Sequence, residues 1–329
     1  MRILAATKDG VARVRIDDGA RLEAELALTG TDVQCIAVDP GDPMRVYAGT
    51  WDHGLHRSSD GGNTWEPVAD VYERRIISVA VGPGDGRRAA AFAGTEPANL
   101  YRSDDGGASW RALPALRRLP SASRWFYPPR RGGERVRSIA PHPTDPALLF
   151  VGIEVGGVMR SLDGGETWED RKRGAFEDSH ALAVHPLAPE RVYQGAAGGV
   201  ALSTDRGQSW RHVDKGVRRR FVWGLAIDPA DPDLWYVSAA HNPHRAHQGA
   251  GNADAAIYRK RGEQRWQAPE HSDRLARMPF ALLTLAGRPG ALLAGLDDGQ
   301  LILSEDAGES WRDLGPRLPQ IRALAGAPA

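Results

Sequence analysis

The chain has 329 residues, and its 42 lysines and arginines are balanced by 42 aspartates and glutamates, so it lacks the basic excess of a generic nucleic-acid-binding protein. Its one cysteine excludes an intrachain disulfide, and no apolar run approaches the ~18 residues of a membrane helix. The first residues, MRILAATKDG, do not resemble a signal peptide, so we expect a cytoplasmic protein without nucleic-acid or membrane partners.

Short strand patterns separated by turns extend along the chain, without long segments of helical period. Residues 3–17 (ILAATKDGVARVRID) match two such strands. From Cys35 onward a unit recurs, in which an apolar strand ending in a proline turn (CIAVDPGDP, SIAPHPTDP, ALAVHPLAP, GLAIDPADP) precedes a second strand such as RVYAGT or LFVGIE. The N-terminal pair matches the second and third strands of this unit and lacks the first.

The third strand of the unit carries an octapeptide of the form Ser-x-Asp-x-Gly-x-Ser/Thr-Trp, which we call the box. Asp can accept backbone N–H groups across the turn, Gly can adopt a left-handed conformation, and Trp covers the turn with apolar area. A degenerate copy, AIYRKRGEQRW, keeps Trp266 but lacks the Asp. The five boxes are SSDGGNTW (58–65), SDDGGASW (103–110), SLDGGETW (161–168), STDRGQSW (203–210) and SEDAGESW (304–311).

These octapeptides resemble the Asp-box, or BNR repeat, of WD40/YVTN/BNR-like propeller proteins. Four short strands every ~40–45 residues are typical of a propeller blade. The tryptophans of the boxes and of the degenerate copy mark six blades, and residues 3–17 begin a seventh, whose first strand is supplied by Ile321–Pro328 (IRALAGAP). We therefore predict an all-β fold: a single seven-bladed β-propeller over residues 1–329, with four antiparallel strands per blade and a ring closed by the C-terminal strand.

The resemblance is closest to bacterial seven-bladed BNR-repeat proteins that are often labelled glycosyl hydrolases. The wider family includes sialidases, xyloglucan hydrolases, sortilin-type receptors and a photosystem assembly factor. This chain lacks the Phe/Tyr-Arg-Ile-Pro motif of sialidases, so a typical sialidase is not expected. Because the repeat is structural, the resemblance predicts the scaffold and leaves the chemistry to individual side chains.

Propeller geometry places the boxes and the proline turns on one face, and two insertions, residues 113–134 and 241–256, on the other. We predict a site at the channel mouth on that second face. One residue of each first strand should point to the axis there: Gln34, Ile77, Arg137, His180, Trp223, Ala281 and Arg322. The ends of second strands add Lys8-Asp9, Trp51-Asp52-His53, Glu96, Glu154 and Asp297-Asp298.

The side-chain types at this mouth suggest two kinds of role. The candidates for catalysis, by proton transfer or nucleophilic attack, are Glu154, Glu96 and His180. Arginines clamp carboxylates or phosphates, and tryptophan faces suit sugar rings. The candidates for ligand binding are therefore Arg137, Trp223, Arg322, Trp51, Asp52 and His53. The alternative is that these groups pair with one another and line a water-filled channel.

The remaining histidines are not assigned chemistry. His241, His244 and His247 lie in one insertion, but their spacing matches no recognised metal motif, so a solvated loop is the preferred interpretation. His142 and His185 fall in proline turns on the face of the boxes and are predicted to be structural. We accordingly predict no metal and no cofactor.

Cys35 lies in an innermost strand and is predicted to be a small core residue. The arginine runs Arg130-Arg131 and Arg218-Arg219-Arg220 are interpreted as solvated faces.

Two functions from different classes stay open. One is a propeller that binds a small polar ligand or carbohydrate at the channel mouth; its enzymatic form would be a glycosidase-like hydrolase or a lyase. The alternative is a non-catalytic scaffold that holds a protein partner with the same face. A hydrolase requires two mouth carboxylates at a glycosidase spacing, whereas a scaffold requires a broad exposed apolar patch. The convergence of several reactive side-chain types favours the small-ligand site.

Overall fold

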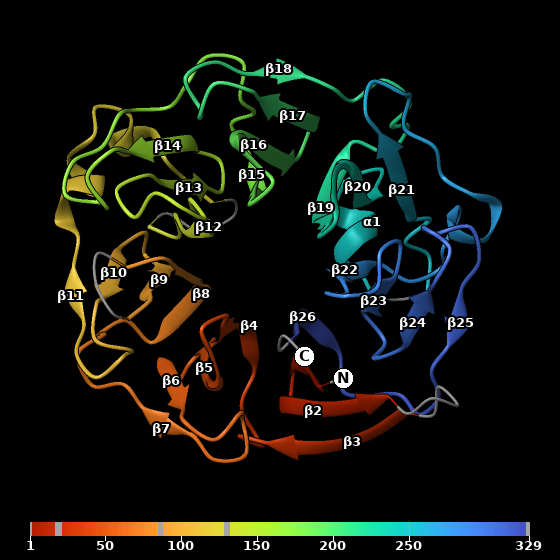
Figure 1. Ribbon diagram of the computed structural model, residues 1–329, viewed down its shortest axis with the longest axis horizontal. Coiled ribbons are helices and arrows are strands. Elements are labelled where there is room, and N and C mark those ends of the chain that lie inside the picture. Colours follow the sequence, from red (N-terminus) through yellow and green to blue (C-terminus); the bar gives the residue numbers. More distant parts are fainter. Residues whose placement is uncertain (1, 17–21, 85–87, 128–131, 250, 327–329) are drawn as a thin grey trace.

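The described residues fold into seven antiparallel β-sheets arranged as blades around a central channel (Figure 1). The computed structural model describes residues 2–16, 22–84, 88–127, 132–249 and 251–326. Over these residues five sheets have four strands and two have three. In the two smaller sheets a single bridge, Arg160 with Glu169 or Arg259 with Gln267, takes the place of the fourth strand. The predicted seven-bladed propeller is confirmed.

The first four blades are built, from the channel outward, as follows. Blade 1 has β26 (Ile321–Gly326), β1 (Arg2–Thr7), β2 (Gly10–Ile16) and β3 (Leu22–Ala27). Blade 2 has β4 (Val33–Asp39), β5 (Asp42–Thr50), β6 (Leu55–Ser58) and β7 (Glu66–Pro67). Blade 3 has β8 (Arg75–Gly82), β9 (Ala90–Glu96), β10 (Leu100–Ser103) and β11 (Arg111–Ala112). Blade 4 has β12 (Val136–Pro141), β13 (Leu149–Ile153) and β14 (Gly157–Ser161).

The last three blades continue in the same order. Blade 5 has β15 (Ser179–His185), β16 (Ala188–Ala196), β17 (Gly199–Ser203) and β18 (Arg211–His212). Blade 6 has β19 (Phe221–Asp228), β20 (Asp231–Ala240) and β21 (Ala256–Arg261). Blade 7 has β22 (Pro279–Thr284), β23 (Leu292–Leu296), β24 (Leu301–Ser304) and β25 (Arg312–Asp313).

Helices are short and confined to connections. The 3-10 helices are Pro114–Arg118, Ala122–Arg124 and Glu270–Ser272, and α1 spans Pro243–His247. No helix in the described part of the chain is long and apolar enough to cross a membrane.

The two ends of the chain share blade 1 (Figure 1). β26 pairs antiparallel with β1, from Ile3 opposite Gly326 to Thr7 opposite Ile321. Each innermost strand contacts the next around the channel, and β26 contacts both β22 and β4. The closure predicted from the missing first strand is confirmed: the C-terminal strand completes the four-stranded sheet of blade 1.

The hydrophobic core is divided among the interfaces between neighbouring blades. Between blades 7 and 1, for example, Leu293 and Ile321 pack with Ile3. Glycines in the second strands allow the next blade to approach closely. A Cβ placed on Gly94 of β9 would lie 2.6 Å from Val136 Cγ1 in β12, so a larger residue there would push blades 3 and 4 apart.

Each box is a hydrogen-bonded turn centred on its aspartate. In the first box, Asp60 Oδ1 accepts from the backbone N–H of Thr64 at 2.9 Å, and the Thr64 hydroxyl donates to Asp60 Oδ2 at 2.6 Å. The Thr64 hydroxyl and backbone bonds lower the pKa of Asp60 to about 2. The Gly61 N–H also donates to Met44 O in the proline turn at 2.8 Å, so the box and the turn share one face.

The box tryptophans face the preceding blade and are buried to different degrees. Trp110 and Trp210 are buried, whereas Trp65, Trp168 and Trp311 are half-buried. The tryptophans that cover the turns are thus buried in two boxes and partly exposed in three. The indole N–H of the half-buried Trp65 donates to Gly62 O at 3.2 Å, which closes the turn and leaves part of the ring at the surface.

Candidate functional site

A β-bulge in the innermost strand of every blade positions the side chains of the channel. At each bulge the inner strand carries one residue more than its partner strand, and this extra residue turns towards the axis. The register shifts pass over Gln34, Ile77, Arg137, His180, Trp223-Gly224, Phe280 and Arg322. Six of the seven predicted mouth positions thus coincide with bulges. In blade 7 the bulge falls at Phe280, one residue before the predicted Ala281, because the strand begins at Pro279.

Two connected levels can be distinguished along the channel. The deeper one, which we call the channel cavity, has a volume of about 240 Å³ and is lined in part by all seven predicted residues. Above it, the mouth cavity has a volume of about 220 Å³. Its lining consists of Asp32, Gln34, Trp51, Ile77, Tyr127, Arg135, Arg137, Trp223, His247, Phe280 and Arg322.

Both insertions contribute to the mouth cavity. The first supplies Tyr127, whose ring lies against the Arg135 guanidinium, with its carbon 3.5 Å from the ring centroid. The second forms α1 and returns His247 to the cavity, where its ring stacks on Phe280 at 5.3 Å between centroids. The insertions therefore build part of the site rather than extending from an indifferent surface.

Glu96 is held in a buried ion-pair network behind the mouth. Its Oε1 lies 2.8 Å from Arg75 Nη1, its Oε2 lies 2.8 Å from Arg135 Nη2, and its side chain is 2% exposed. Neither cavity includes Glu96 in its lining. With both oxygens close to arginines and outside the lining of both cavities, Glu96 positions Arg135, and its catalytic role stays a prediction.

Arg137 has a different environment from Arg135. Its guanidinium lies over Trp223, with 4.3 Å from the guanidinium carbon to the ring centroid. Its nearest acid is Glu154, at 3.9 Å from Nε to Oε2, which is too long for a hydrogen bond. Within the described part of the chain Arg137 donates no hydrogen bond, and its Nε is buried. Partial burial lowers the pKa of Arg137, because the charged form loses part of its stabilisation by water.

The opposite wall of the mouth is aromatic. Trp223 lies 4.8 Å from His247 and 5.6 Å from Phe280, measured between ring centroids. Desolvation by these rings, followed by the positive charge of Arg137 and its neighbours, lowers the pKa of His247 to about 4. The mouth thus combines an aromatic wall with an arginine-rich wall.

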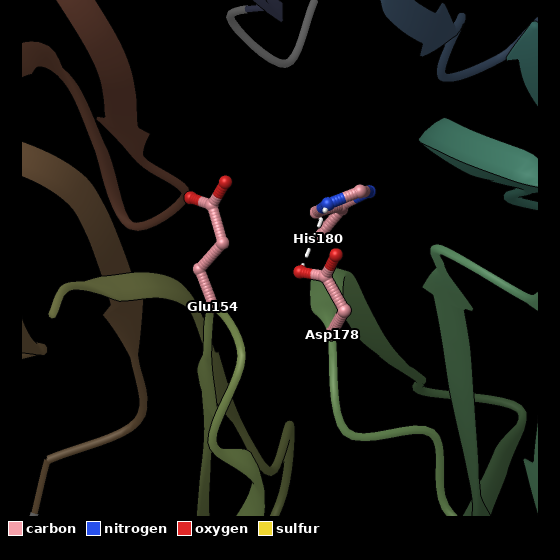
Figure 2. A group of neighbouring side chains, drawn as sticks. All are labelled: Glu154, Asp178 and His180. Atoms are coloured by element: carbon pink, nitrogen blue, oxygen red, sulfur yellow. Dashed lines mark ion pairs between the residues drawn. The ribbon is translucent and has the colours of Figure 1, made fainter. Parts of the chain in front are cut away.

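His180, Asp178 and Glu154 form a group at the boundary between blades 4 and 5 (Figure 2). His180 sits in the bulge of β15, Asp178 immediately precedes that strand, and Glu154 follows β13. His180 Nδ1 lies 2.6 Å from Val222 O, and its Nε2 lies 3.3 Å from Asp178 Oδ1. Glu154 Oε2 is buried and accepts no hydrogen bond from a described residue.

The remaining predicted ligand-binding residues occupy different places. Trp51 and Arg322 line the mouth cavity. Asp52 and His53 are exposed on the rim outside its lining, because they lie in the turn after β5. These two were predicted from their position at a strand end, but the turn carries them away from the channel axis.

Cys35, His241 and His244, for which the sequence predicted no chemical role, lie in environments that agree with that prediction. Burial raises the pKa of the Cys35 thiol to about 12, so it is no nucleophile at neutral pH. His241 lies 3.0 Å from Asp254 and His244 contacts Gln248, so neither accompanies His247 into the mouth cavity.

The arginine runs behave less uniformly. Arg219 is buried between Asp254 and Asp273, at 2.8 and 2.6 Å, and contradicts the solvated-face interpretation because it anchors the second insertion. Arg130 and Arg131 lie outside the described residues.

The prediction from sequence missed Arg135, Tyr127, Asp178 and the cavity role of His247. Arg135 and Asp178 each lie two residues before a bulge residue, so the alternation of the strand could have indicated both. Nothing in the local sequence indicates that Tyr127 and His247 return from their insertions to the axis.

Neither a protein-family profile nor a curated protein sequence matches this chain. Solved structures are similar in fold. The GH74 xyloglucanase from Xanthomonas campestris is 20% identical with a TM-score of 0.63, over 86% of this chain and 45% of that one. YCF48 bound to D1 peptide is 19% identical with a TM-score of 0.58, over 88% and 84%. The RRP9 WD40 repeats are 12% identical with a TM-score of 0.65, over 99% and 89%.

The chain covers 36% of an ancestral GH74 enzyme and thus spans well under half of its length. Enzymes and non-catalytic propellers both occur among the similar structures, and at these identities the likeness establishes the β-propeller alone.

Proposed function

We propose that the mouth cavity binds a small ligand that carries an anionic group, of which a carboxylate fits best, next to a flat ring or sugar face. The environment of Arg137 is the observation on which this proposal rests. It presents a half-buried side chain, 18% exposed, whose Nε is buried and whose guanidinium has no hydrogen-bond acceptor among the described residues, in a cavity of about 220 Å³. A carboxylate can accept two parallel N–H bonds from one guanidinium, which would offset the desolvation of Arg137.

The neighbours of Arg137 support an anion over a cation in this cavity. Arg135 and Arg322 also line it, and the Nε atom of each is buried without a hydrogen bond. Arg322 lies 3.5 Å from Asp32, at the limit of a hydrogen bond. The aromatic wall formed by Trp223, His247 and Phe280 would cover the face of the ligand.

The enzymatic form of this proposal is a glycosidase-like hydrolase or a lyase within a BNR-type propeller family. It rests on Glu154 and His180, since Glu96 already gives both oxygens to arginines. A sugar acid would satisfy both the binding proposal and this chemistry. The arrangement supports binding more directly than hydrolysis, because neither Glu96 nor Glu154 contributes to the lining of the mouth cavity.

The alternative occupant is a peptide held by the same face, as in a scaffold protein. One observation favours it: YCF48 bound to D1 peptide matches this chain over most of both lengths. A peptide would offer its terminal or side-chain carboxylate to the same arginine, so Arg137 is central to both occupants and the occupant itself must be tested.

Isothermal titration with D-glucuronate, D-glucose and a short peptide with a free or an amidated C-terminus tests the proposal. We expect glucuronate to bind and glucose to bind more weakly. Charged hydrogen bonds contribute about 1.5–3 kcal/mol, so Arg137→Gln should weaken glucuronate binding about 10- to 150-fold. The control Arg220→Gln removes a surface guanidinium and should leave binding unchanged.

Selective binding of the free-acid peptide would favour the scaffold function. Failure of both acids to bind, or equal binding to wild type and Arg137→Gln, would reject the anion site.

A further inference from the structure

Glu154, Asp178 and His180 converge from two blades at the wall of the channel (Figure 2). Each offers one ligand atom, and these atoms all lie within 4.8 Å of one another. Backbone bonds hold the segments that carry them: Glu154 N–H donates to Arg135 O at 3.2 Å, and Asp178 O accepts from Ala197 N–H at 3.0 Å. The three side chains are therefore positioned by the scaffold rather than by a loose surface loop.

The hydrogen bond of His180 determines which ring nitrogen is free. Nδ1 lies 2.6 Å from Val222 O, and a carbonyl oxygen only accepts, so the proton resides on Nδ1. In the neutral ring Nε2 then carries a lone pair that faces Asp178 Oδ1 at 3.3 Å. Two acceptors at this distance require a proton or a cation between them. Metal-binding histidines commonly donate their other N–H to a backbone carbonyl in this way.

The spacing of the two atoms fits a tetrahedral metal ion. Ligand atoms about 2.0–2.2 Å from Zn²⁺ at a tetrahedral angle are about 3.4 Å apart. The observed separation between His180 Nε2 and Asp178 Oδ1, 3.3 Å, agrees with this value. A single proton shared between His180 and Asp178 would also account for this distance, but it would not explain why Glu154 lies beside them.

The environment of Glu154 favours a cation over a proton. Its side chain is 7% exposed, and its Oε2 accepts no hydrogen bond from a described residue. Arg135 and Arg137 approach this oxygen only to 3.6 and 3.9 Å through their Nε atoms. A dication bound to two carboxylates and a neutral imidazole would be balanced in charge, and it would provide Glu154 with a close partner.

We propose that Glu154, Asp178 and His180 bind a divalent transition-metal ion, with Zn²⁺ the best match for one imidazole and two carboxylates. Three protein ligands leave one tetrahedral position for water or for a ligand group. This site adjoins the anion site, since Glu154 Oε2 lies 3.9 Å from Arg137 Nε, but it uses different side chains to hold its ligand. The two are tested with different ligands, so either proposal can fail without the other.

The test is calorimetric titration of chelator-treated protein with ZnCl₂, followed by Co²⁺ substitution. We expect one Zn²⁺ per chain, and a visible Co²⁺ spectrum of the intensity typical of four-coordinate cobalt. Loss of a residue that merely supports a ligand costs about 10- to 100-fold in metal affinity, so loss of a direct ligand in Asp178→Asn or Glu154→Gln should cost at least about 100-fold. Both substitutions preserve side-chain shape.

His180→Gln should also abolish binding, and His244→Gln in the exposed loop is its matched control. The His180 ring lies 4.8 Å from the Trp223 ring, so His180→Gln could also disturb packing. Its result therefore counts only if its melting curve matches that of the wild type; if the curves differ, Asp178→Asn is the deciding variant. The proposal is overturned if the wild type binds no Zn²⁺, if Asp178→Asn and Glu154→Gln bind it unchanged, or if His244→Gln is the variant that loses it. A wild type without metal uptake would identify the pair of His180 and Asp178 as a proton-mediated contact.

Discussion

Substitution of Arg135 by glutamine should lower the free energy of unfolding by about 3 kcal/mol. The Arg135 side chain is 10% exposed and lies between two buried carboxylates, 2.8 Å from Glu96 Oε2 and 3.6 Å from Glu154 Oε2. Removing one partner of a buried ion pair costs about 3–5 kcal/mol, mostly because the other charge stays buried. Arg75 still pairs with Glu96 after the substitution, which places the expected cost at the lower end.

Urea unfolding followed by far-UV circular dichroism measures this cost, provided that the denaturant dependence is unchanged between variants. Arg220→Gln serves as the control, because Arg220 is 59% exposed and its pair with Asp214 should contribute about 0–1 kcal/mol. The double variant Arg135→Gln/Glu96→Gln should recover at least about 1 kcal/mol relative to the sum of the single variants. A cost for Arg135→Gln below about 1 kcal/mol, or strict additivity of the two changes, would refute the role of Arg135 as the link between the carboxylates.

Three further predictions concern the scaffold. Asp60 has a folded pKa of about 2 against an ordinary 3.8, so the stability that it contributes is present above pH 3.8 and is lost as the pH falls through 2. The melting temperature should therefore fall less steeply between pH 5 and pH 2 for Asp60→Asn than for the wild type, and identical slopes would contradict this. Trp110→Ala should cost about 3–5 kcal/mol in urea unfolding, and Trp65→Ala clearly less because its ring is only half-buried; equal costs would argue against this packing. Ile321→Ala should cost about 2–5 kcal/mol by the same measurement, since Ile321 is fully buried in the closing strand, and a cost below 1 kcal/mol would show that closure does not depend on it.

The repeat made the scaffold and the register of the site predictable. Each first strand has the same pattern, so the sequence could indicate which residue of each strand is turned towards the axis. Arg137, His180 and Arg322 lie at the predicted positions because their blades share one local geometry. The prediction missed by one residue at Phe280, where Pro279 begins the strand and moves the bulge.

The partners of each residue could not be predicted in this way, since they depend on contacts between blades. Glu96 and Glu154 occupy corresponding strand ends and were given the same role from sequence. In the structure Glu96 is neutralised by Arg75 and Arg135, whereas Glu154 lies near Asp178 and His180 of the next blade. The difference arises from side-chain reach across a blade interface, which a single sequence does not encode as a local pattern.

The two interpretations of the channel mouth, a ligand site or a set of internal ion pairs, make different demands on its charges. Internal pairing accounts fully for Glu96, whose two oxygens each meet a guanidinium at 2.8 Å. It does not account for Arg137, which is half-buried over Trp223 and donates no hydrogen bond to a described residue. A channel filled only for stability would be expected to pair this charge as it pairs Glu96, because a partly desolvated charge without hydrogen bonds costs free energy. The same bulge that turns Arg137 towards the axis in blade 4 presents neutral Gln34 and Ile77 in blades 2 and 3, so the scaffold does not require an arginine there. The cost thus falls on the blades that carry an arginine, at the cavity where an anionic ligand would offset it.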